Sequence, residues 1–222
     1  MLNLFFPPIC SACATHLTDN EVQVCTSCRH KLPLTNFHED SNNAVHQILY
    51  GRVKLEHATA LLHFSKKGLV QQLMHNLKYR GQESIGEFLG QWLGEELKLI
   101  MAYHDIDIVV PVPLHKSKMK SRGYNQVDKF GMALANALGA KFNTSVLVKT
   151  TNTATQVFKD RLKRNVNRTP NFKVINTHLL EHQHVLLVDD IITTGATIED
   201  CANCLFTIPG LKLSLATMAI TD

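Results

Sequence analysis

Residues His184 to Ile198, HVLLVDDIITTGATI, constrain the fold of this chain more than any other stretch. Four apolar residues, 185–188, run directly into two adjacent carboxylates, Asp189 and Asp190. An unbroken apolar run of this length is typical of a strand that is buried on both faces of a parallel sheet. The next residues include a run of small and hydroxyl side chains around one glycine: Thr193, Thr194, Gly195, Ala196 and Thr197. The pattern predicts a buried strand that leads into a loop holding a phosphorylated ligand.

The residue types in this loop suit a ribose 5-phosphate. Small residues let several backbone N–H groups converge on one phosphate, and the helix that follows directs the positive end of its dipole there. Gly195 permits close backbone approach, and the threonine hydroxyls donate further hydrogen bonds. Asp189 and Asp190 fit beside a phosphate if they accept hydrogen bonds from two neighbouring hydroxyls or attract a divalent cation. The alternative, in which they cap a turn and a helix, explains one aspartate but not both.

Strands and helical stripes alternate along the rest of the chain, which predicts a doubly wound parallel α/β sheet. Ligands bind at the carboxyl ends of the strands in such a sheet, so loops 113–123, 149–168 and 189–197 are expected to meet there. Cys201 and Cys204 are expected to pack in the core, because they lie within a helical pattern. Strands are expected at 56–64, 107–112, 145–148, 172–175, 185–188 and 211–220, and helices around 69–77, 85–100, 124–138 and 198–206.

Two C-x2-C pairs near the start predict a separate metal-binding unit. Four thiolates complete a tetrahedral zinc site, so a zinc ion held by Cys10, Cys13, Cys25 and Cys28 would be structural. Two disulfides, four free thiols or a redox role are the alternatives, and disulfides fit a reducing compartment poorly. The predicted organisation is a zinc ribbon over residues 1–35, a linker over 36–55 and an α/β domain over 56–222.

The composition provides enough hydrophobic residues for a core and does not indicate a membrane-spanning protein. Of the 222 residues 45% are hydrophobic, yet no segment has about 18 apolar residues in a row. The first eight residues have neither a basic segment nor a long apolar core, so no secretory signal is expected. We therefore expect a cytoplasmic protein without membrane insertion.

Positive charge is concentrated in two stretches, although the net charge is only +4. Residues 115–129 contain five cations and one carboxylate, Asp128, and residues 149–168 contain six cations and one carboxylate, Asp160. Clusters of this kind indicate an anionic ligand or a solvated surface. The cations are Lys116, Lys118, Lys120, Arg122 and Lys129 in the first stretch and Lys149, Lys159, Arg161, Lys163, Arg164 and Arg168 in the second.

The segment VLLVDDIITTGAT resembles the phosphoribosyl-pyrophosphate (PRPP) binding motif of the type I phosphoribosyltransferases. The whole chain resembles the ComF/GntX family, in which a zinc ribbon precedes a phosphoribosyltransferase-like domain and which is associated with competence and DNA uptake. Besides the cysteine pairs, the resemblance rests on LKYRG at 77–81, PVPLH at 111–115, RGYNQ at 122–126, and Thr153, Gln156, Arg161, Arg164 and Asn167. It implies a doubly wound sheet of the type I phosphoribosyltransferase kind with a small N-terminal zinc ribbon.

The resemblance also implies a role for each loop. Asp189 and Asp190 would hold the ribose hydroxyls and Thr193–Thr197 the 5-phosphate. His115, Lys116 and Arg122 would bind pyrophosphate together with Mg²⁺. Lys149, Arg161 and Arg164 would close over the site and act in catalysis with the acidic pair. Lys78 and Arg80 end a helix, where cations are favoured anyway, so no role is assigned to them.

The sequence departs from the family pattern at three places. Tyr124 replaces a usual phenylalanine, and Thr151 stands where a second basic residue is common. Lysines occupy 116, 118 and 120 where arginine is usual, which replaces bidentate contacts by point charges.

Two functions of different classes remain open. One is an enzyme that transfers a 5-phosphoribosyl group from PRPP to an unidentified acceptor. The other is a non-catalytic adaptor that binds PRPP or a nucleotide while its zinc ribbon docks onto a protein of the DNA-uptake machinery. Direct binding of single-stranded DNA is weakly supported, because the two basic stretches contain only Tyr124 and Phe158 as aromatic platforms. The acceptor, the partner and the oligomeric state are not identified by the sequence.

Overall fold

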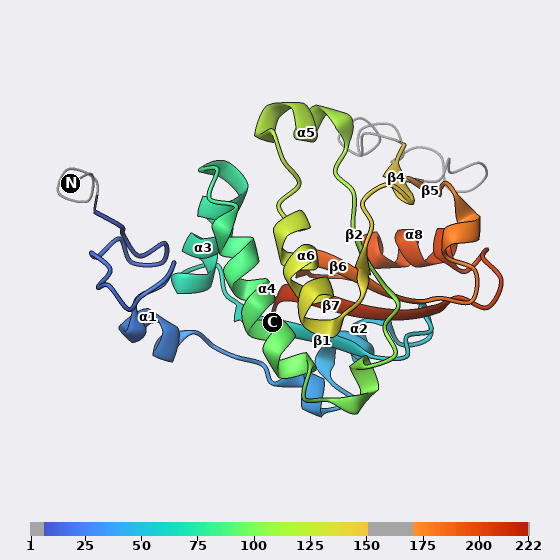
Figure 1. The fold of residues 1–222 in the computed structure, drawn as a ribbon, viewed down its shortest axis with the longest axis horizontal. Helices are drawn as coiled ribbons and strands as arrows, with labels where there is room; N and C mark the ends of the chain where they lie inside the picture. The colour runs from blue at the N-terminus through green and yellow to red at the C-terminus, as the bar shows by residue number, and fades with distance from the viewer. Residues whose placement is uncertain (1–6, 151–170, 222) are drawn as a thin grey trace, which may run out of the picture.

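The computed structural model describes residues 7–150 and 171–221, and its centre is a five-stranded sheet in which all strands are parallel (Figure 1). The strand order is β1-β7-β6-β2-β3. The strands are β1 (Ala58–Phe64), β2 (Ile108–Pro111), β3 (Lys141–Phe142), β6 (His184–Ile192) and β7 (Lys212–Thr221). The strand predicted at 185–188 is longer in the structure, since β6 spans His184–Ile192, and both aspartates of the motif lie within it.

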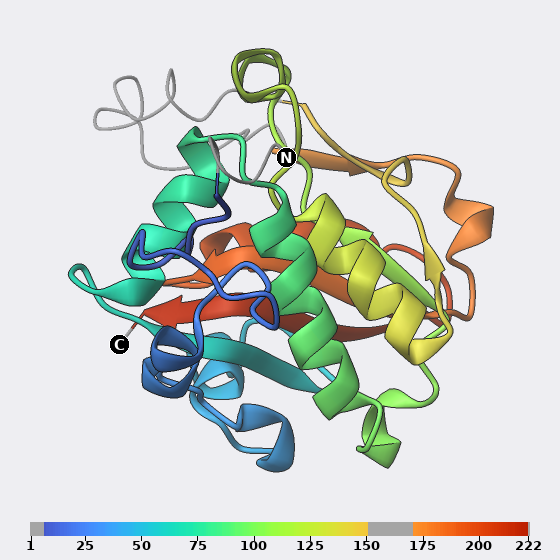
Figure 2. The same ribbon diagram turned by 60° about the vertical axis from the view of Figure 1, so that its left-hand side comes forward.

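Helices cover both faces of the sheet, so the doubly wound fold is confirmed. Alternate residues of β6 point to opposite faces, with Leu186 and Val188 in one core and Val185 and Leu187 in the other. The first core receives α3 (Leu69–Tyr79), α4 (Ser84–Leu97) and α6 (Asp128–Leu138). Figure 2 shows α4 in green and α6 in yellow lying side by side across this face. The second core receives α2 (Ala44–Leu49) and α8 (Ala196–Leu205).

Two expected strands form a small sheet of their own. The strands predicted at 145–148 and 172–175 are β4 (Leu147–Lys149) and β5 (Phe172–Val174), which pair antiparallel to each other and not with the main sheet. The edge position of the main sheet is taken by β3, whose two residues are too few to give a sequence pattern. The basic stretch expected as a loop contains the helix α5 (Lys116–Arg122), which Gly123 ends with a φ of 84°. Short 3-10 helices complete the fold at η2 (Phe37–Glu39), η3 (Met101–Tyr103) and η4 (Thr177–Leu179).

Residues 36–55 pack against the sheet rather than crossing open surface. The side chain of Asn43 caps α2 by accepting from the amides of Val45 and His46, and it donates to the carbonyl of Ala58 in β1. Val45 and Leu49 are fully buried in the second core. An amphipathic pattern of two turns was too short to reveal this helix in the sequence.

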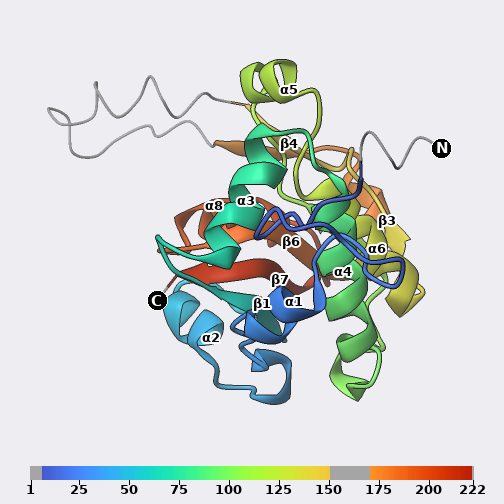
Figure 3. The same ribbon diagram turned by 90° about the vertical axis from the view of Figure 1, so that its left-hand side faces the viewer.

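The cysteine-rich segment lies against α3 and α4 (Figure 3). Its short helix α1 (Thr26–Lys31) places the Arg29 guanidinium 4.7 Å from the centre of the Trp92 ring. Asn76 of α3 donates to the carbonyl of Ser11 at 2.8 Å. The unit is thus joined to the helix that ends at Lys78 and Tyr79. Among the described residues, no helix is both long and apolar enough to cross a membrane.

Candidate functional site

The acidic pair lies at the carboxyl end of β6, directly before the hydroxyl loop. Oδ1 of Asp189 accepts from the amide of Asp190 at 2.8 Å, and Oδ1 of Asp190 accepts from the amide of Ile191 at 2.6 Å. Within the described residues, neither carboxylate caps α8, because its N-cap is Gly195 and no side chain bonds there. The capping alternative therefore does not account for these aspartates.

Asp190 is held by two side chains from other elements. Its Oδ2 is 2.8 Å from Nζ of Lys78 at the end of α3 and accepts from Nε2 of Gln126 at 2.7 Å. Gln126 accepts in turn from Nη1 of Arg122 at 2.5 Å. The ion pair is partly shielded from water, with 20% of the Lys78 side chain and 11% of the Asp190 side chain exposed. This network fixes one carboxylate and joins it to α3 and α5.

Asp189 has a different electrostatic environment. Burial, followed by the charge of Asp190, raises the pKa of Asp189 to about 8. The amide of Asp190 and the charges of Lys78 and Lys149 oppose this shift, but they do not overcome it. At neutral pH the Asp189 carboxyl therefore retains its proton in most molecules. Hydroxyl donors or a cation placed beside Asp189 would favour loss of that proton.

The loop from Thr193 to Thr197 presents unused hydrogen-bond donors. Thr193, Thr194, Ala196 and Thr197 are exposed, whereas Gly195 is buried. In the part of the chain that the structure describes, none of the amides from 193 to 197 donates to another protein group. The loop encloses a hollow of about 50 Å³ that Asp189 also lines. Free amides at the start of a ten-residue helix are the arrangement that binds phosphate in proteins.

The buried side of this loop is supported by α2 and the residues after it. Gly195 has a φ of 75°, and a β-carbon there would lie 2.6 Å from Cδ2 of Leu49 and 3.1 Å from Cγ2 of Ile48. Arg52 donates to the carbonyls of Thr194, at 2.7 Å, and of Ile48, and its Nη1 is 2.9 Å from Oε2 of Glu199. Only glycine fits position 195, and Arg52 holds one carbonyl of the loop so that the amides face outward.

The residues expected to bind pyrophosphate lie at two ends of α5. His115 is the N-cap of this helix, and its Nδ1 accepts from the amide of Ser117 at 3.2 Å. Lys116 is exposed at the first position of the helix, whereas Arg122 is at the last position and bonds Gln126. Seven residues of helix extend about 10 Å, so the three side chains do not form one cluster.

Of the cations expected to close over the site, one is described. Lys149 is at the end of β4, where its Nζ lies 4.9 Å from the centre of the Phe172 ring. Burial and then the charge of Lys118 lower the pKa of Lys149, and Asp189 is among the groups that oppose this shift. Arg161 and Arg164, with Thr151, Thr153, Gln156 and Asn167, lie outside the described residues.

The four cysteines of the N-terminal unit come together as a potential metal site. The Sγ atoms of Cys10, Cys13, Cys25 and Cys28 all lie within 4.8 Å of one another. Sγ of Cys10 accepts from the amides of Ala12 and Cys25 at 3.4 and 3.3 Å. Hydrogen bonds from Thr15 lower the pKa of Cys13 to about 6, which favours a thiolate at neutral pH. This donor set fits a metal such as zinc. Cys201 is fully buried in the second core, as expected, and Cys204 is partly buried beside it.

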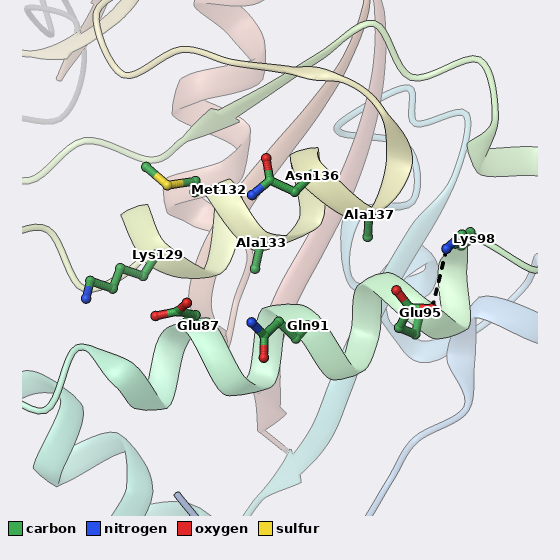
Figure 4. A pocket seen from close by; sticks show the side chains of 9 residues that line it. All are labelled: Glu87, Gln91, Glu95, Lys98, Lys129, Met132, Ala133, Asn136 and Ala137. Atoms are coloured by element: carbon green, nitrogen blue, oxygen red, sulfur yellow. Dashed lines mark ion pairs between the residues drawn. The ribbon is translucent and has the colours of Figure 1, made fainter. Parts of the chain in front are cut away.

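A larger cavity, of about 520 Å³, lies away from the acidic pair between α4 and α6 (Figure 4). It forms above the contact where Gly90 and Gly94 of α4 meet α6 so closely that a β-carbon would clash. Its lining mixes both signs of charge, and Lys98 is paired with Glu95. Its lining residues as described include no serine, threonine, cysteine or histidine, and we assign no function to it.

Three residues of the site were missed by the sequence analysis. Lys78 was assigned no role because a cation at a helix end needs no further explanation. Gln126 was part of a stretch that carried the family resemblance, but it received no role of its own. Arg52 lies in the expected linker, and no local pattern indicated that its guanidinium reaches the loop 142 residues away in sequence.

The structure shows a doubly wound parallel α/β domain with a small N-terminal four-cysteine unit, as predicted. The DNA utilization protein YhgH of Salmonella typhi is 29% identical over 136 residues, which are 60% of this chain and 59% of that protein. Competence protein ComFC of Bacillus subtilis is 25% identical over 207 residues, 86% of this chain and 81% of the relative. Competence protein F of Haemophilus influenzae is 26% identical over 137 residues, 60% of each chain. The chain is thus similar to proteins named for competence and DNA utilization.

The solved structures to which the chain is similar are more distant in sequence than these relatives. The PRPP amidotransferase of B. subtilis, complexed with ADP and GMP, has a TM-score of 0.43 and 16% identity, over 65% of this chain and 30% of its own. Adenine phosphoribosyltransferase of Leishmania tarentolae has a TM-score of 0.38 and 12% identity, over 82% of this chain and 89% of its own. No family model matches the chain. The match to YhgH spans 59% of that protein's length, so the activity of the whole relative does not transfer directly.

Proposed function

We propose that this protein binds PRPP and transfers its 5-phosphoribosyl group to an acceptor, with release of pyrophosphate. The observation that carries the proposal is the set of unoccupied amides from Thr193 to Thr197 beside the acidic pair. A 5-phosphate on these amides would leave the ribose over the carboxylates, where the two ring hydroxyls can donate to Asp189 and Asp190. The hollow of about 50 Å³ that the loop encloses is lined by both the loop and Asp189.

The proposed reaction is a displacement at the anomeric carbon. A nitrogen of the acceptor forms a bond to that carbon, and the bond from the carbon to the pyrophosphate oxygen breaks with both electrons leaving on pyrophosphate. The proton of the attacking nitrogen passes to the departing pyrophosphate. Positive charge develops on the ribose ring during this step, and the carboxylates of Asp189 and Asp190 stabilise it. Lys116 and Lys149 supply cations for the leaving group, and Arg161 and Arg164 are proposed to join them.

Two metal ions belong to the proposal in different roles. Zn²⁺ on Cys10, Cys13, Cys25 and Cys28 would stabilise the fold of the N-terminal unit, since four thiolates leave no open coordination position. Mg²⁺ would enter with PRPP and neutralise part of the pyrophosphate charge. A thiolate cluster of this kind persists in a reducing compartment, so we place the protein in the cytoplasm. The proposed units are a zinc ribbon over 1–35 and an α/β domain that begins near 56, with 36–55 as a connection that packs on the sheet.

A non-catalytic role is the second candidate, and the names of the relatives favour it. They are described as competence or DNA utilization proteins and not as transferases. In this role the α/β domain binds PRPP or a nucleotide, and the four-cysteine unit docks onto a protein of DNA uptake.

Pyrophosphate release separates the two candidates. Purified protein is incubated with PRPP and Mg²⁺, with and without each nucleobase, and pyrophosphate is measured together with PRPP binding. Release that depends on an added base, and that Asp189→Asn abolishes, supports the transferase. Binding of PRPP without turnover supports the adaptor, and absence of PRPP binding rejects both assignments of the loop. Metal analysis of the same preparation should find one zinc per chain, which Cys10→Ser with Cys13→Ser removes.

A further inference from the structure

A basic cleft with one exposed aromatic ring is lined by residues from the end of α3 and from α5, and one of them, Lys78, pairs with Asp190. Its volume is about 450 Å³, within the range of small-molecule sites. None of the roles proposed above uses it as a binding site. Its main lining residues are Lys78, Tyr79, Lys118, Ser121, Arg122 and Tyr124.

The cleft is strongly positive. Lys78, Lys118 and Arg122 line it, and none of its described lining residues is a carboxylate. The α5 segment that forms one wall, KSKMKSR, has four cations and no acidic residue. Asp190 neutralises Lys78 at 2.8 Å, so Lys118 and Arg122 are the cations left for a ligand. An anionic group is the matching ligand chemistry, and the Arg122 fork suits a carboxylate or phosphate.

The cleft also has a stacking surface. Tyr79 is 67% exposed, although the centre of the His75 ring lies 5.3 Å from the centre of its own ring. The guanidinium carbon of Arg122 lies 5.3 Å from the centre of this ring and orients it. The hydroxyl of Tyr124 donates to the carbonyl of Leu77, which ties the end of α3 to the segment after α5. A planar ring can therefore stack on Tyr79 between two walls that are joined to each other.

The walls of the cleft are connected to the proposed ribose site. Lys78 contacts Asp190 directly, and Arg122 reaches the same carboxylate oxygen through Gln126. A molecule in the cleft would thus lie beside a ribose held by Asp189 and Asp190, which is where an acceptor has to be. We propose that the cleft binds the acceptor, and that this acceptor is a planar heteroaromatic ring bearing a negative charge. The ring stacks on Tyr79 and its anionic group is held by Lys118 and Arg122. This inference rests on the proposed function.

A pair of probes that differ by one carboxylate tests the inference. Calorimetric titrations compare ribose 5-phosphate, uridine 5′-monophosphate and orotidine 5′-monophosphate, which add first a ring and then a charge on the ring. We expect the uridine nucleotide to bind about tenfold more tightly than ribose 5-phosphate, because stacking of one base contributes on that order. We expect orotidine 5′-monophosphate to bind severalfold more tightly again.

Variants separate the contribution of ring stacking to nucleotide binding from the contribution of the negative charge. Tyr79→Ala should remove the tenfold gain from the ring and leave ribose 5-phosphate binding unchanged, whereas Tyr79→Phe should retain the gain. Lys118→Ala should abolish the preference for the orotidine over the uridine nucleotide. Lys120→Ala is the matched control, since Lys120 is exposed on the same helix but does not line the cleft.

The outcomes distinguish the cleft from the phosphate loop. If all three probes bind the unmodified protein equally, or if Tyr79→Ala weakens ribose 5-phosphate as much as the nucleotides, the cleft is not an acceptor site. Free orotate and uracil, titrated without sugar, probe the cleft alone. Binding of orotate that Lys118→Ala weakens, in a protein that does not bind ribose 5-phosphate, would keep the cleft and reject the proposed function.

Discussion

The loop at 193–197 and the α3–α5 side of the acidic pair are built in opposite ways. The loop takes its shape from the backbone and from packing, since Gly195 fits against Leu49 and its amides are left free. The other side takes its shape from side chains, since Lys78, Gln126 and Arg122 converge on Asp190 through ionic and polar bonds. The comparison implies that a change in the packing of the loop should weaken ligand binding strongly, whereas a change of one side chain on the α3–α5 side should weaken it less.

The largest effect on ligand binding is expected from replacing both Asp189 and Asp190, which lie between the loop and the α3–α5 side. At pH 9, where Asp189 has lost its proton, Asp189→Asn with Asp190→Asn should weaken PRPP binding by at least about 100-fold, because two hydrogen bonds to charged acceptors are lost, each contributing about 1.5–3 kcal/mol. The shapes of the side chains are conserved, so the far-ultraviolet circular dichroism spectrum should not change. Titration of PRPP monitored by calorimetry measures the effect. Unaltered affinity in the double variant would reject the ribose assignment.

A methyl group at Gly195 tests whether packing shapes the loop. Gly195→Ala introduces strain at a φ of 75° and a contact of 2.6 Å with Leu49, so the loop must shift and binding of ribose 5-phosphate should fall about 50-fold. Gly139→Ala is the matched control, since it has a φ of 69° but no atom within 4 Å of the added carbon. The control should lose some thermal stability and keep its affinity. Equal losses of affinity in both variants would mean that the loop is not held by this contact.

The pH dependence of binding tests the electrostatic asymmetry of the pair. The pKa of Asp189 is raised to about 8 by burial and by Asp190, so its carboxylate becomes available as an acceptor only as the pH rises through that value. Affinity for ribose 5-phosphate should increase about tenfold between pH 7 and 9, in proportion to the deprotonated fraction. The same raised pKa means that Asp189 opposes folding as the pH rises from about 4 to 8, because the folded state binds the extra proton.

Two controls test this pH profile: one changes the residue and the other changes the ligand. Asp189→Asn should flatten the increase, and 2-deoxyribose 5-phosphate, which lacks one hydroxyl, should show a smaller increase than ribose 5-phosphate. An affinity that falls between pH 7 and 9 in the unmodified protein would contradict the protonation state assigned to Asp189.

The smallest effect on ligand binding is expected at Arg52, which contacts the buried side of the loop. Arg52→Gln removes the hydrogen bond to the carbonyl of Thr194, and we expect ribose 5-phosphate to bind about fivefold more weakly with little change in stability, because the Arg52–Glu199 pair is solvent-accessible. Glu199→Gln removes the other partner of Arg52 and should leave affinity unchanged. If Glu199→Gln had the larger effect, the ion pair and not the carbonyl contact would position the loop.

The sequence predicted the parts of this molecule that depend on local pattern. The strand before the acidic pair, the stripes of α3, α4 and α6, and the stop at Gly139 follow from periodicity and backbone conformation that neighbouring residues determine. The four cysteines were found because metal ligands have fixed spacing. Each of these features is specified within about 20 residues of chain.

The features that the sequence did not predict depend on contacts between segments that are distant along the chain. α2 is only six residues long, and its helical state is stabilised by burial of Val45 and Leu49 against the sheet. β4 and β5 have ordinary strand patterns, and only the folded chain shows that they pair with each other outside the main sheet. Lys78 is 112 residues from Asp190 in sequence, so no spacing rule indicated their ion pair.

A structure of the protein with ribose 5-phosphate tests the central claim most directly. We predict that phosphate oxygens lie within hydrogen-bond distance of the amides around Gly195, and that the 2- and 3-hydroxyls donate to Asp189 and Asp190. A phosphate bound elsewhere, with the amides from Thr193 to Thr197 still unoccupied or taken by another part of the chain, would contradict it.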